Sequence, residues 1–365
     1  MAAPTPLLAA PNTTPTADAY RFGGARPTPA PCGAPPCWLV LAVAAALLAA
    51  VPAAFSVSYR TYAVTTGSGA IVVTGASSGI GAHAAEALAR RGWVVFAGVR
   101  SEAAAAAVRA VGVASLVPLV LDVTSAASRE AALAALAAEL AERGNLPLVA
   151  LINNAGISRS GLPLEVEPEA QTREVFETNV FGALATTQLL LPLLRASQGR
   201  LVFVSSVAGV LSAVPTMGAY AASKHALEAL ADAFRRELAH AGVSVSVVEP
   251  AFVRTLIAQN NRAASQGDVV VAAAAARAAA AYPWLGESAR RGDGDVARGD
   301  DPQVVTDVLV HAVESRAPRT RYVCASLFLG SGKFKMPAEV ITWLDWLLPD
   351  RLMDALVGAS YKRSV

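Results

Sequence analysis

Two side chains that could transfer a proton together stand four residues apart in the segment "YAASK", where Tyr220 is followed by Lys224. Residues at positions i and i+4 share one face of a helix, so the phenol and the ammonium point the same way. A tyrosine with its ordinary pKa of about 10 is a poor base at neutral pH. A nearby ammonium favours the phenolate, so we expect Lys224 to lower the pKa of Tyr220 and prepare it for proton transfer with an alcohol or a ketone.

The alternative interpretation of "YAASK" is an ordinary solvated helix turn. The chain holds 7 tyrosines and 4 lysines among 365 residues, so random placement would produce about 0.08 such pairs. The pair alone does not decide between the two interpretations, and the surrounding motifs carry the argument.

A glycine-rich turn forms the second candidate site, in "TGASSGIG" from Thr74 to Gly81. Its glycines, Gly75, Gly79 and Gly81, permit a sharp turn and a close approach of the backbone to a ligand. The turn follows a strand-like run and opens a helix-like segment, whose N-terminus would attract a pyrophosphate. We therefore predict a dinucleotide-binding loop, and the alternative is a tight turn that binds no ligand.

The elements that position these sites alternate from residue 70 onward. Runs such as "AIVVTG", "WVVFAGV" and "GRLVFVSS" are rich in β-branched residues and have no polar face, which indicates strands buried on both sides. Helix-like segments separate them, and "REVFETNVFGALATTQLLLPLLRA" predicts one long helix. The alternation predicts an α/β fold with a doubly wound parallel sheet, the Rossmann fold, in a single catalytic domain over 68–330.

Five motifs occur in the order found in the classical short-chain dehydrogenase/reductase family, which the chain resembles from about residue 70 to 325. They are the glycine turn, Asp122 in "LDVT", "NNAG" over 153–156, Asn179 in "TNVFG", and "VSSVAG" followed by "YAASK". The resemblance implies an oxidoreductase that acts on CH–OH donors with NAD or NADP as cofactor. The catalytic tetrad that it implies consists of Asn179, Ser206, Tyr220 and Lys224.

The resemblance also implies roles for these residues. Ser206 would hydrogen-bond the substrate oxygen; Ser205 competes for this role, but Ser206 has the family's usual spacing of 14 residues before Tyr220. Lys224 would hold the nicotinamide ribose, and Asn179 would position a water in a proton relay. The cofactor contacts implied are Gly75, Ser77, Ser78, Gly79, Ile80, Gly81, Arg100, Asp122, Asn154, Ala155, Gly156, Tyr220, Lys224, Pro250 and Thr255.

The choice between the two cofactors depends on the end of the second predicted strand, "FAGVRS". An acidic residue there would bind the ribose 2′-hydroxyl of NAD, whereas an arginine accommodates the 2′-phosphate of NADP. Val99 occupies the acid position and Arg100 follows it, which favours NADP. Ser78, however, stands where many NADP-preferring relatives carry a basic residue, so NAD remains the alternative.

A further motif, "EPAFVRT", resembles the family's proline-glycine segment. Pro250 and Thr255 are in place, and the resemblance implies that Thr255 binds the nicotinamide carboxamide. Ala251 replaces the glycine, which leaves the local backbone conformation open.

The N-terminal part of the chain differs in composition. Residues 1–37 are rich in Pro, Ala and Thr, which predicts disorder. Residues 38–55 form an uncharged apolar run, and a helix of this length would span about 27 Å, close to the hydrocarbon core of a bilayer. We expect a single-pass transmembrane or signal-anchor helix in an endomembrane. The alternatives are a cleaved targeting segment, which would leave a soluble enzyme in an organelle lumen or stroma, and a buried soluble helix.

The substrate side is expected to be apolar. Residues 256–300 form a long insertion, which the resemblance identifies as the mobile substrate lid. The segment from "DPQVV" to "RTRYVCA" resembles the branch of retinol and hydroxysteroid dehydrogenases. Residues 331–365 form an amphipathic extension, in which "VITWLDWLLPDRLMDALV" predicts a helix pair that packs in the core, forms a dimer face, lies on a membrane or caps the substrate.

These features predict a lipophilic primary or secondary alcohol and its aldehyde or ketone, retinoid-, steroid- or lipid-like, as the small-molecule substrate. The alternative function is a non-catalytic NAD(P)-binding regulator. The resemblance further implies a homo-oligomer.

Composition argues against other classes of function. The formal net charge is +2, from 30 basic and 28 acidic residues, and no long basic run is present, so we expect no nucleic-acid partner. Cys32, Cys37 and Cys324 cannot form a disulfide framework. No histidine lies near the first two cysteines, so we expect no metal site.

Overall fold

The computed structural model describes residues 61–62, 68–159, 161–255, 268–329, 334–347, 349 and 352. All structural statements refer to these residues. The predicted disordered segment 1–37 and the apolar run 38–55 lie outside the described residues.

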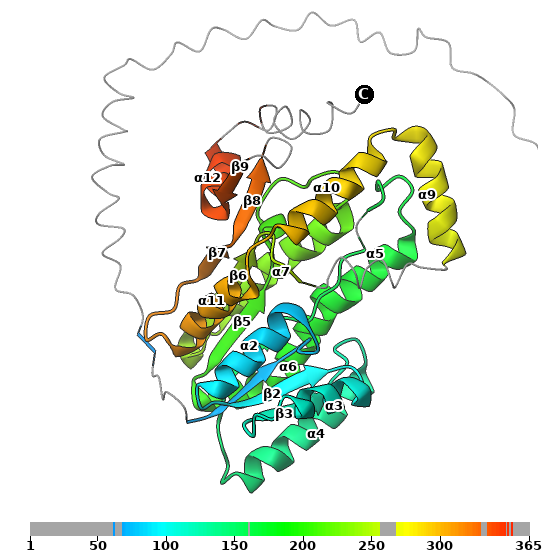
Figure 1. Cartoon of the computed structure of the whole chain (residues 1–365). Coiled ribbons are helices and arrows are strands. Elements are labelled where there is room, and N and C mark those ends of the chain that lie inside the picture. Colours follow the sequence, from blue (N-terminus) through cyan, green and yellow to red (C-terminus); the bar gives the residue numbers. More distant parts are fainter. Residues whose placement is uncertain are drawn as a thin grey trace, which may run out of the picture. The chain divides into compact units, whose positions relative to one another are not determined.

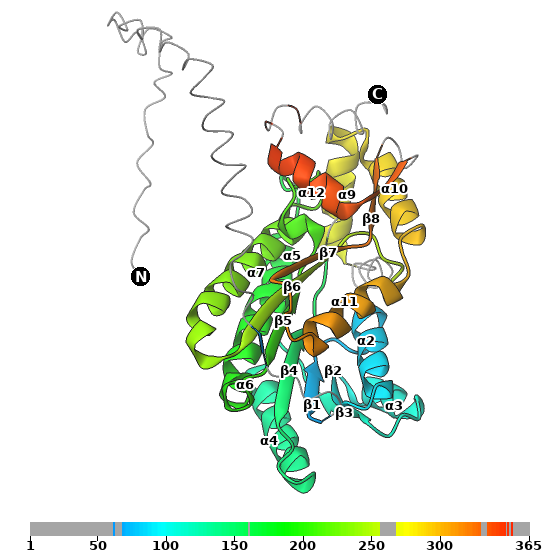
Figure 2. The same cartoon turned by 90° about the vertical axis from the view of Figure 1, so that its left-hand side faces the viewer.

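Seven parallel strands form the central sheet (Figure 1), in the order β3-β2-β1-β4-β5-β6-β7, which can be followed in Figure 2. Most of their apolar residues are buried on both faces, as the sequence pattern predicted, and the edge strand β3 is the most exposed. The order reverses between β1 and β4, and parallel sheets of this kind bind ligands outside the carboxyl ends of the strands at such a point. The strands are β1 (Ala70–Val73), β2 (Val94–Val99), β3 (Leu116–Val120), β4 (Leu148–Asn153), β5 (Arg200–Val204), β6 (Ser244–Pro250) and β7 (Arg321–Cys324).

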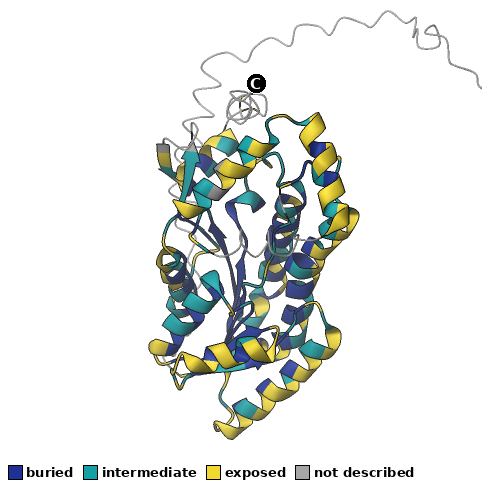
Figure 3. Cartoon of the chain, turned by 45° about the vertical axis from the view of Figure 1, so that its right-hand side comes forward, coloured by how far each residue is buried: buried dark blue, intermediate teal, exposed yellow. Residues whose placement is uncertain are grey.

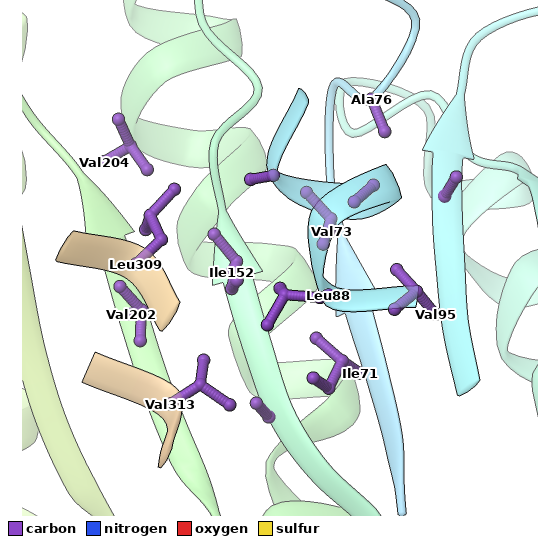
Figure 4. Close-up of a cluster of buried hydrophobic side chains, with 14 of the residues drawn as sticks. Ile71, Val73, Ala76, Leu88, Val95, Ile152, Val202, Val204, Leu309 and Val313 are labelled. Carbon is purple, nitrogen blue, oxygen red and sulfur yellow. The ribbon is translucent and has the colours of Figure 1, made fainter. Parts of the chain in front are cut away.

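Helices cover both faces of the sheet, which confirms the doubly wound fold (Figure 2). One face packs against α2 (Gly79–Arg90), α3 (Glu102–Ala110) and α11 (Pro302–Glu314). On this side Leu88 of α2 and Leu309 of α11 lie over strand side chains such as Ile152 (Figure 4). The other face packs against α4 (Ala126–Glu142), α6 (Ala183–Ser197) and α7 (Gly218–Glu237).

Burial follows this layering (Figure 3): the strands are buried, and the outer faces of the helices are exposed. Burial of continuous apolar strands between two helix layers provides the main hydrophobic driving force for this fold. The side chains predicted for catalysis and cofactor binding are therefore attached to a closely packed framework.

The predicted long helix is interrupted by a π-helical segment. It consists of α5 (Glu169–Phe176), the π-helix η1 (Glu177–Gly182) and α6. At Gly182 a side chain would meet Val123 at 2.8 Å, so the missing Cβ lets this segment approach the loop after β3. Single π-helical turns inside α-helices occur frequently at functional sites, and this one contains Asn179.

Among the described residues, the continuous helix over 169–197 is apolar and long enough to cross a membrane. Its buried residues Val175, Ala183, Leu190 and Leu194 face the interior of the catalytic domain. It is therefore a core helix of this domain. The bent pair formed by α9 (Val269–Ala281) and α10 (Leu285–Ala297) passes the same test only if the two helices are taken together across a bend of 117°.

The C-terminal part contains the first helix of the predicted pair and, before it, a hairpin that was not predicted. An antiparallel hairpin of β8 (Ser326–Leu329) and β9 (Phe334–Pro337) comes first, and α12 (Ala338–Leu347) follows it. The hairpin was missed because its strands are short and Ala325, with φ 66°, turns the chain out of β7 without a glycine. The second predicted helix lies outside the described residues.

Candidate functional site

The turn between β1 and α2 depends on three glycines. Gly75 and Gly79 have φ values of 65° and 58°, in the left-handed region that favours glycine. At Gly81 a Cβ would lie 2.3 Å from Nδ2 of Asn154 and 2.5 Å from the carbonyl oxygen of Gly75. Any side chain at Gly81 would therefore force α2 away from the turn.

The N-terminus of α2 is open toward a ligand. Ser78 is the N-cap residue but makes no side-chain capping hydrogen bond, and the first turn holds no acidic residue. The first amide groups of a helix lack intrahelical acceptors and carry partial positive charge, so they bind anions. The glycine cradle and the uncapped helix fit the pyrophosphate of a nicotinamide dinucleotide. Ser77 is exposed beside the turn, and Ile80 packs against the core cluster on this face of the sheet.

Thr74 joins the glycine turn to the "NNAG" segment. Its hydroxyl accepts hydrogen bonds from the backbone amides of Asn154, at 3.0 Å, and Ala155, at 2.9 Å. Asn154 returns two bonds through Nδ2, to the carbonyl oxygens of Thr74 at 2.9 Å and Gly75 at 3.2 Å. Thr74 is not among the predicted site residues, and the signal for it in the sequence is its position directly before Gly75.

The "EPAFVRT" segment lies over the glycine turn. A Cβ added at Gly79 would meet the Thr255 side chain at 3.4 Å, and Pro250 ends β6. Ala251 does not have a positive φ; the described non-glycine residues that do are Asn145, Gln198, Thr216 and Ala325. The position therefore does not require glycine, and the replacement leaves the backbone unstrained.

The two residues predicted to bind the adenosine half of the cofactor, Arg100 and Asp122, each follow the end of a strand. Arg100 follows β2 and is exposed. Asp122 follows β3 and is half-buried, and its Oδ1 accepts hydrogen bonds from the backbone amide of Thr124, at 2.9 Å, and from its hydroxyl, at 2.7 Å. The carboxylate of Asp122 is thus held in a local turn next to β3.

Tyr220 and Lys224 lie on one face of α7, with the Lys224 Nζ 5.7 Å from the centroid of the Tyr220 ring. Lys224 is buried and donates a hydrogen bond from Nζ to the carbonyl oxygen of Val204, at 3.0 Å. Ser206 follows β5; its hydroxyl donates to the carbonyl oxygen of Pro250 at 3.4 Å and accepts from the backbone amide of Ala208 at 3.2 Å, and it lies near enough to the Tyr220 phenol to affect its pKa. The Oγ atom of Ser205 is buried and has no hydrogen-bond partner among the described residues, and of the two serines it is Ser206 that affects the pKa of the phenol.

The electrostatics of the pair differ from our expectation. Burial raises the pKa of Tyr220, and the nearby hydroxyl of Ser206 only partly opposes this effect. Burial lowers the pKa of Lys224 to about 8, and the charge of Glu228 opposes that shift. The expectation that the pKa of Tyr220 is lowered was therefore wrong. It considered the charge of the Lys224 ammonium but not the loss of solvent around the phenol, which disfavours the phenolate.

Asn179 is buried and its side chain is fully engaged. Its Oδ1 accepts from the backbone amide of Ile157 at 2.8 Å, and its Nδ2 donates to the Ile157 carbonyl oxygen at 2.9 Å and to Oγ of Ser223 at 3.0 Å. The Ser223 hydroxyl donates in turn to the carbonyl oxygen of Tyr220, at 2.7 Å. Asn179 thereby ties η1 to the first turn of α7.

Gly156 completes the approach to this cluster. A Cβ at Gly156 would lie 3.3 Å from Oδ1 of Asn179 and 3.5 Å from Nζ of Lys224. The "NNAG" segment therefore passes close to the catalytic candidates as well as to the glycine turn. The structure brings the predicted tetrad and the predicted cofactor loop to the same carboxyl edge of the sheet.

Comparison with known proteins agrees with this geometry. The family model described as short chain dehydrogenase matches residues 69–266, more than half of the chain. The uncharacterized oxidoreductase YbbO of Escherichia coli K12 is 35% identical over 293 residues, which cover 79% of this chain and 93% of the relative. Mouse retinol dehydrogenase 16 is 34% identical over 290 residues, which cover 79% of this chain and 87% of the relative.

A solved short chain dehydrogenase/reductase from Burkholderia phymatum, in complex with NAD, has 27% sequence identity and a TM-score of 0.58. The match covers 72% of this chain and 90% of that chain. The fold, the motif order and the relatives, among them a retinol dehydrogenase, agree, and the chain is an oxidoreductase that belongs to the short-chain dehydrogenase family and has its NAD(P)-binding fold.

Proposed function

We propose that the chain catalyses the NAD(P)-dependent interconversion of a lipophilic alcohol and its ketone or aldehyde. The observation that carries this proposal is the convergence of Ser206, Tyr220 and Lys224 at the edge of the sheet that also presents the glycine turn. A nicotinamide bound in that cradle would supply or accept the hydride. The residues of the chain then have only to bind and orient the substrate and to move one proton.

Tyr220 is the residue that transfers this proton. Because burial raises its pKa, the phenol is protonated at neutral pH and suited to donate a proton to a substrate carbonyl oxygen. The Ser206 hydroxyl shares that position and orients the oxygen. Lys224 is mainly an ammonium at pH 7, because its pKa is about 8, and its positive charge favours the phenolate left after proton donation. These charge states favour the reductive direction.

For the cofactor we propose NADP in preference to NAD. Val99 ends β2 and no acidic side chain stands at this point, whereas the exposed Arg100 comes next. A guanidinium there is suited to bind a 2′-phosphate in a bidentate manner. Asp122 on the neighbouring strand end is proposed to contact the adenine.

A lipophilic substrate is supported by the elements around the catalytic loop. The helix α12 is joined to the loop between Ser206 and Tyr220, because the amide of Ser212 donates to Oδ2 of Asp345 at 3.0 Å. On this helix Trp343 and Trp346 are 65% and 76% exposed. The relative named a retinol dehydrogenase fits the same class of substrate. Anchoring through 38–55, a lid over 256–300 and a homo-oligomer remain predictions.

The experiment that tests this function compares the wild-type protein with Tyr220→Phe. Oxidation of NADPH and NADH is followed at neutral pH with all-trans-retinal, a 3-ketosteroid and long-chain aldehydes, and cofactor binding is measured separately by nicotinamide fluorescence. We expect turnover of at least one lipophilic carbonyl compound, an about 100-fold or larger loss in Tyr220→Phe, as for removal of a general acid, and unchanged cofactor binding. Equal activity in both proteins would favour the non-catalytic alternative.

A further inference from the structure

A cluster of buried and partly buried charged side chains lies one helical turn beyond Lys224. It joins α7 to β6 and β7, and none of its members takes part in the proposed reaction. Its carboxyl groups are largely removed from solvent, since Glu228 and Glu249 are 7% and 1% exposed. The cluster consists of Glu228 and Asp232 on α7, Glu249 on β6 and Arg321 on β7.

Arg321 holds the cluster together. Its Nε lies 3.2 Å from Oε2 of Glu228 and 3.3 Å from Oε1 of Glu249, and its Nη2 lies 3.1 Å from Oδ1 of Asp232. Arg235 provides a second guanidinium, 3.0 Å from the same Asp232 oxygen. The three carboxyl groups come from two elements that follow each other in the chain, α7 and β6, and Arg321 contacts them all from β7, which is distant in the sequence.

The charges of the cluster do not balance if every carboxyl group is ionised. Asp232 is neutralised by Arg235 and Arg321, which lower its pKa. Burial, and next the charge of Glu228, raise the pKa of Glu249 to about 8, so Glu249 is the group that keeps its proton at neutral pH. Burial raises the pKa of Glu228 as well, but the ion pair with Arg321, at 3.2 Å, opposes this shift and makes Glu228 the remaining anion.

Lys224 needs such an anion. A buried ammonium is costly unless it is paired or hydrogen-bonded to compensating groups, and the acceptor seen for Lys224 Nζ is the neutral carbonyl oxygen of Val204. Glu228 stands four residues after Lys224 on α7, and both side chains are buried. It is the anionic side chain that acts on the lysine, in the direction that favours the ammonium.

We propose that Glu228 is a positioning residue for the Tyr220–Lys224 pair: it supplies the negative charge that retains the Lys224 ammonium in the interior, and Arg321 and Glu249 hold it in place. The groups that face Glu228 are Lys224 and Asp232 from its own helix, Glu249 from β6 and Arg321 from β7. Glu228 touches neither substrate nor cofactor in this scheme. The proposal rests on the proposed function only in giving Lys224 a catalytic role.

The test is a direct titration of Lys224 in the full chain. The sequence holds only 4 lysines, so labelling with lysine that carries ¹³C at Cε gives few NMR signals, and Lys224→Arg assigns the relevant one. We expect a pKa of about 8 in the wild-type protein and a value lower by about one unit in Glu228→Gln, the shift expected from loss of one nearby charge. At pH 7.5 the ammonium fraction would then fall about threefold.

Three variants complete the test. Glu228→Asp keeps the negative charge, so the pKa of Lys224 should stay close to its wild-type value. Glu237→Gln removes an exposed charge from the end of the same helix and should leave the pKa of Lys224 unchanged. Glu249→Gln leaves Glu228 in place beside Arg321, so the pKa of Lys224 should not fall, and a fall would count against the proposal even if Glu228→Gln does not fold.

An unchanged Lys224 pKa in folded Glu228→Gln, or a fall in Glu249→Gln, would overturn the proposal. The titration requires neither cofactor nor turnover, so such a result would leave the proposed function standing. Loss of turnover in Tyr220→Phe and a shifted lysine pKa in Glu228→Gln are thus independent outcomes.

Discussion

Replacement of Gly81 by alanine is the sharpest test of the glycine cradle. The added Cβ would stand 2.3 Å from Nδ2 of Asn154 and 2.5 Å from the carbonyl oxygen of Gly75. Ordinary van der Waals contact begins at about 3.4 Å, so α2 has to move by about 1 Å relative to the turn. The displaced groups are the amides at the helix N-terminus that we propose to bind the pyrophosphate.

Two effects of the Gly81→Ala substitution can be estimated, a loss of stability and a loss of dinucleotide affinity. Overpacking of a tight contact costs about 1 to 3 kcal/mol of stability. A displacement of about 1 Å also removes most of the energy of one hydrogen bond to a charged phosphate, about 1.5 to 3 kcal/mol, which corresponds to a roughly 10- to 150-fold weaker binding of the dinucleotide. We expect both effects in Gly81→Ala.

Gly292→Ala is the matched control. Gly292 lies in α10, and a Cβ there meets no atom within 4 Å. The same substitution should stabilise that helix by about 0.5 to 1 kcal/mol and leave binding unchanged. The assays are urea denaturation and titration with NADPH and NADH by fluorescence. Wild-type affinity in folded Gly81→Ala would refute the placement of the pyrophosphate at this turn.

Three further predictions concern the framework and the cofactor preference. Arg100→Ala should weaken NADPH binding about tenfold or more and leave NADH binding nearly unchanged, measured by the same titrations, since only NADP carries the 2′-phosphate; equal losses for both cofactors would contradict this role. Thr74→Val leaves two backbone amides without their acceptor and should lower the free energy of unfolding, measured by urea denaturation, by about 2 to 4 kcal/mol. Thr186→Val is the control, because it replaces a buried hydroxyl that has no hydrogen-bond partner among the described residues, and it should be neutral or stabilising. Similar losses of stability in both variants would show that the Thr74 hydrogen bonds are unimportant. The pKa of Glu249 is raised from 4.5 to about 8 in the folded protein, so the native state binds more protons than the unfolded state between these values, and stability falls as the pH rises through this window. Between pH 5 and pH 8, the free energy of unfolding of Glu249→Gln should therefore rise by about 3 kcal/mol relative to that of the wild-type protein. The same difference in unfolding free energy between the two proteins at both pH values, measured by urea denaturation, would contradict this prediction.

Much of the site could be predicted from local patterns. The helical period places Tyr220 and Lys224 on one face of α7, and Gly75 and Gly79 occur where the backbone takes positive φ. These features depend on a few neighbouring residues, which is why the sequence was sufficient for them. The same holds for the buried parallel strands, whose apolar runs admit no solvated face.

Other features depend on contacts between distant segments. The π-helical turn at Asn179 is held by Ile157 from the loop after β4, and the hairpin β8–β9 follows a positive φ at Ala325 that no glycine signals. The ionisation of the site is the clearest case. A spacing of four residues predicted that Lys224 would act on the Tyr220 phenol, but burial has the larger effect on the pKa of both groups.

The sequence by itself thus determined the fold class, the order of the motifs and the residue types available for proton transfer, because helix period, strand burial and glycine conformations are encoded over short stretches. Only the tertiary structure decided how charged those residues are. Desolvation and the encounter of Glu228 and Glu249 with Arg321 arise when α7, β6 and β7 pack together, and the energy of a charge depends on the surroundings that packing creates.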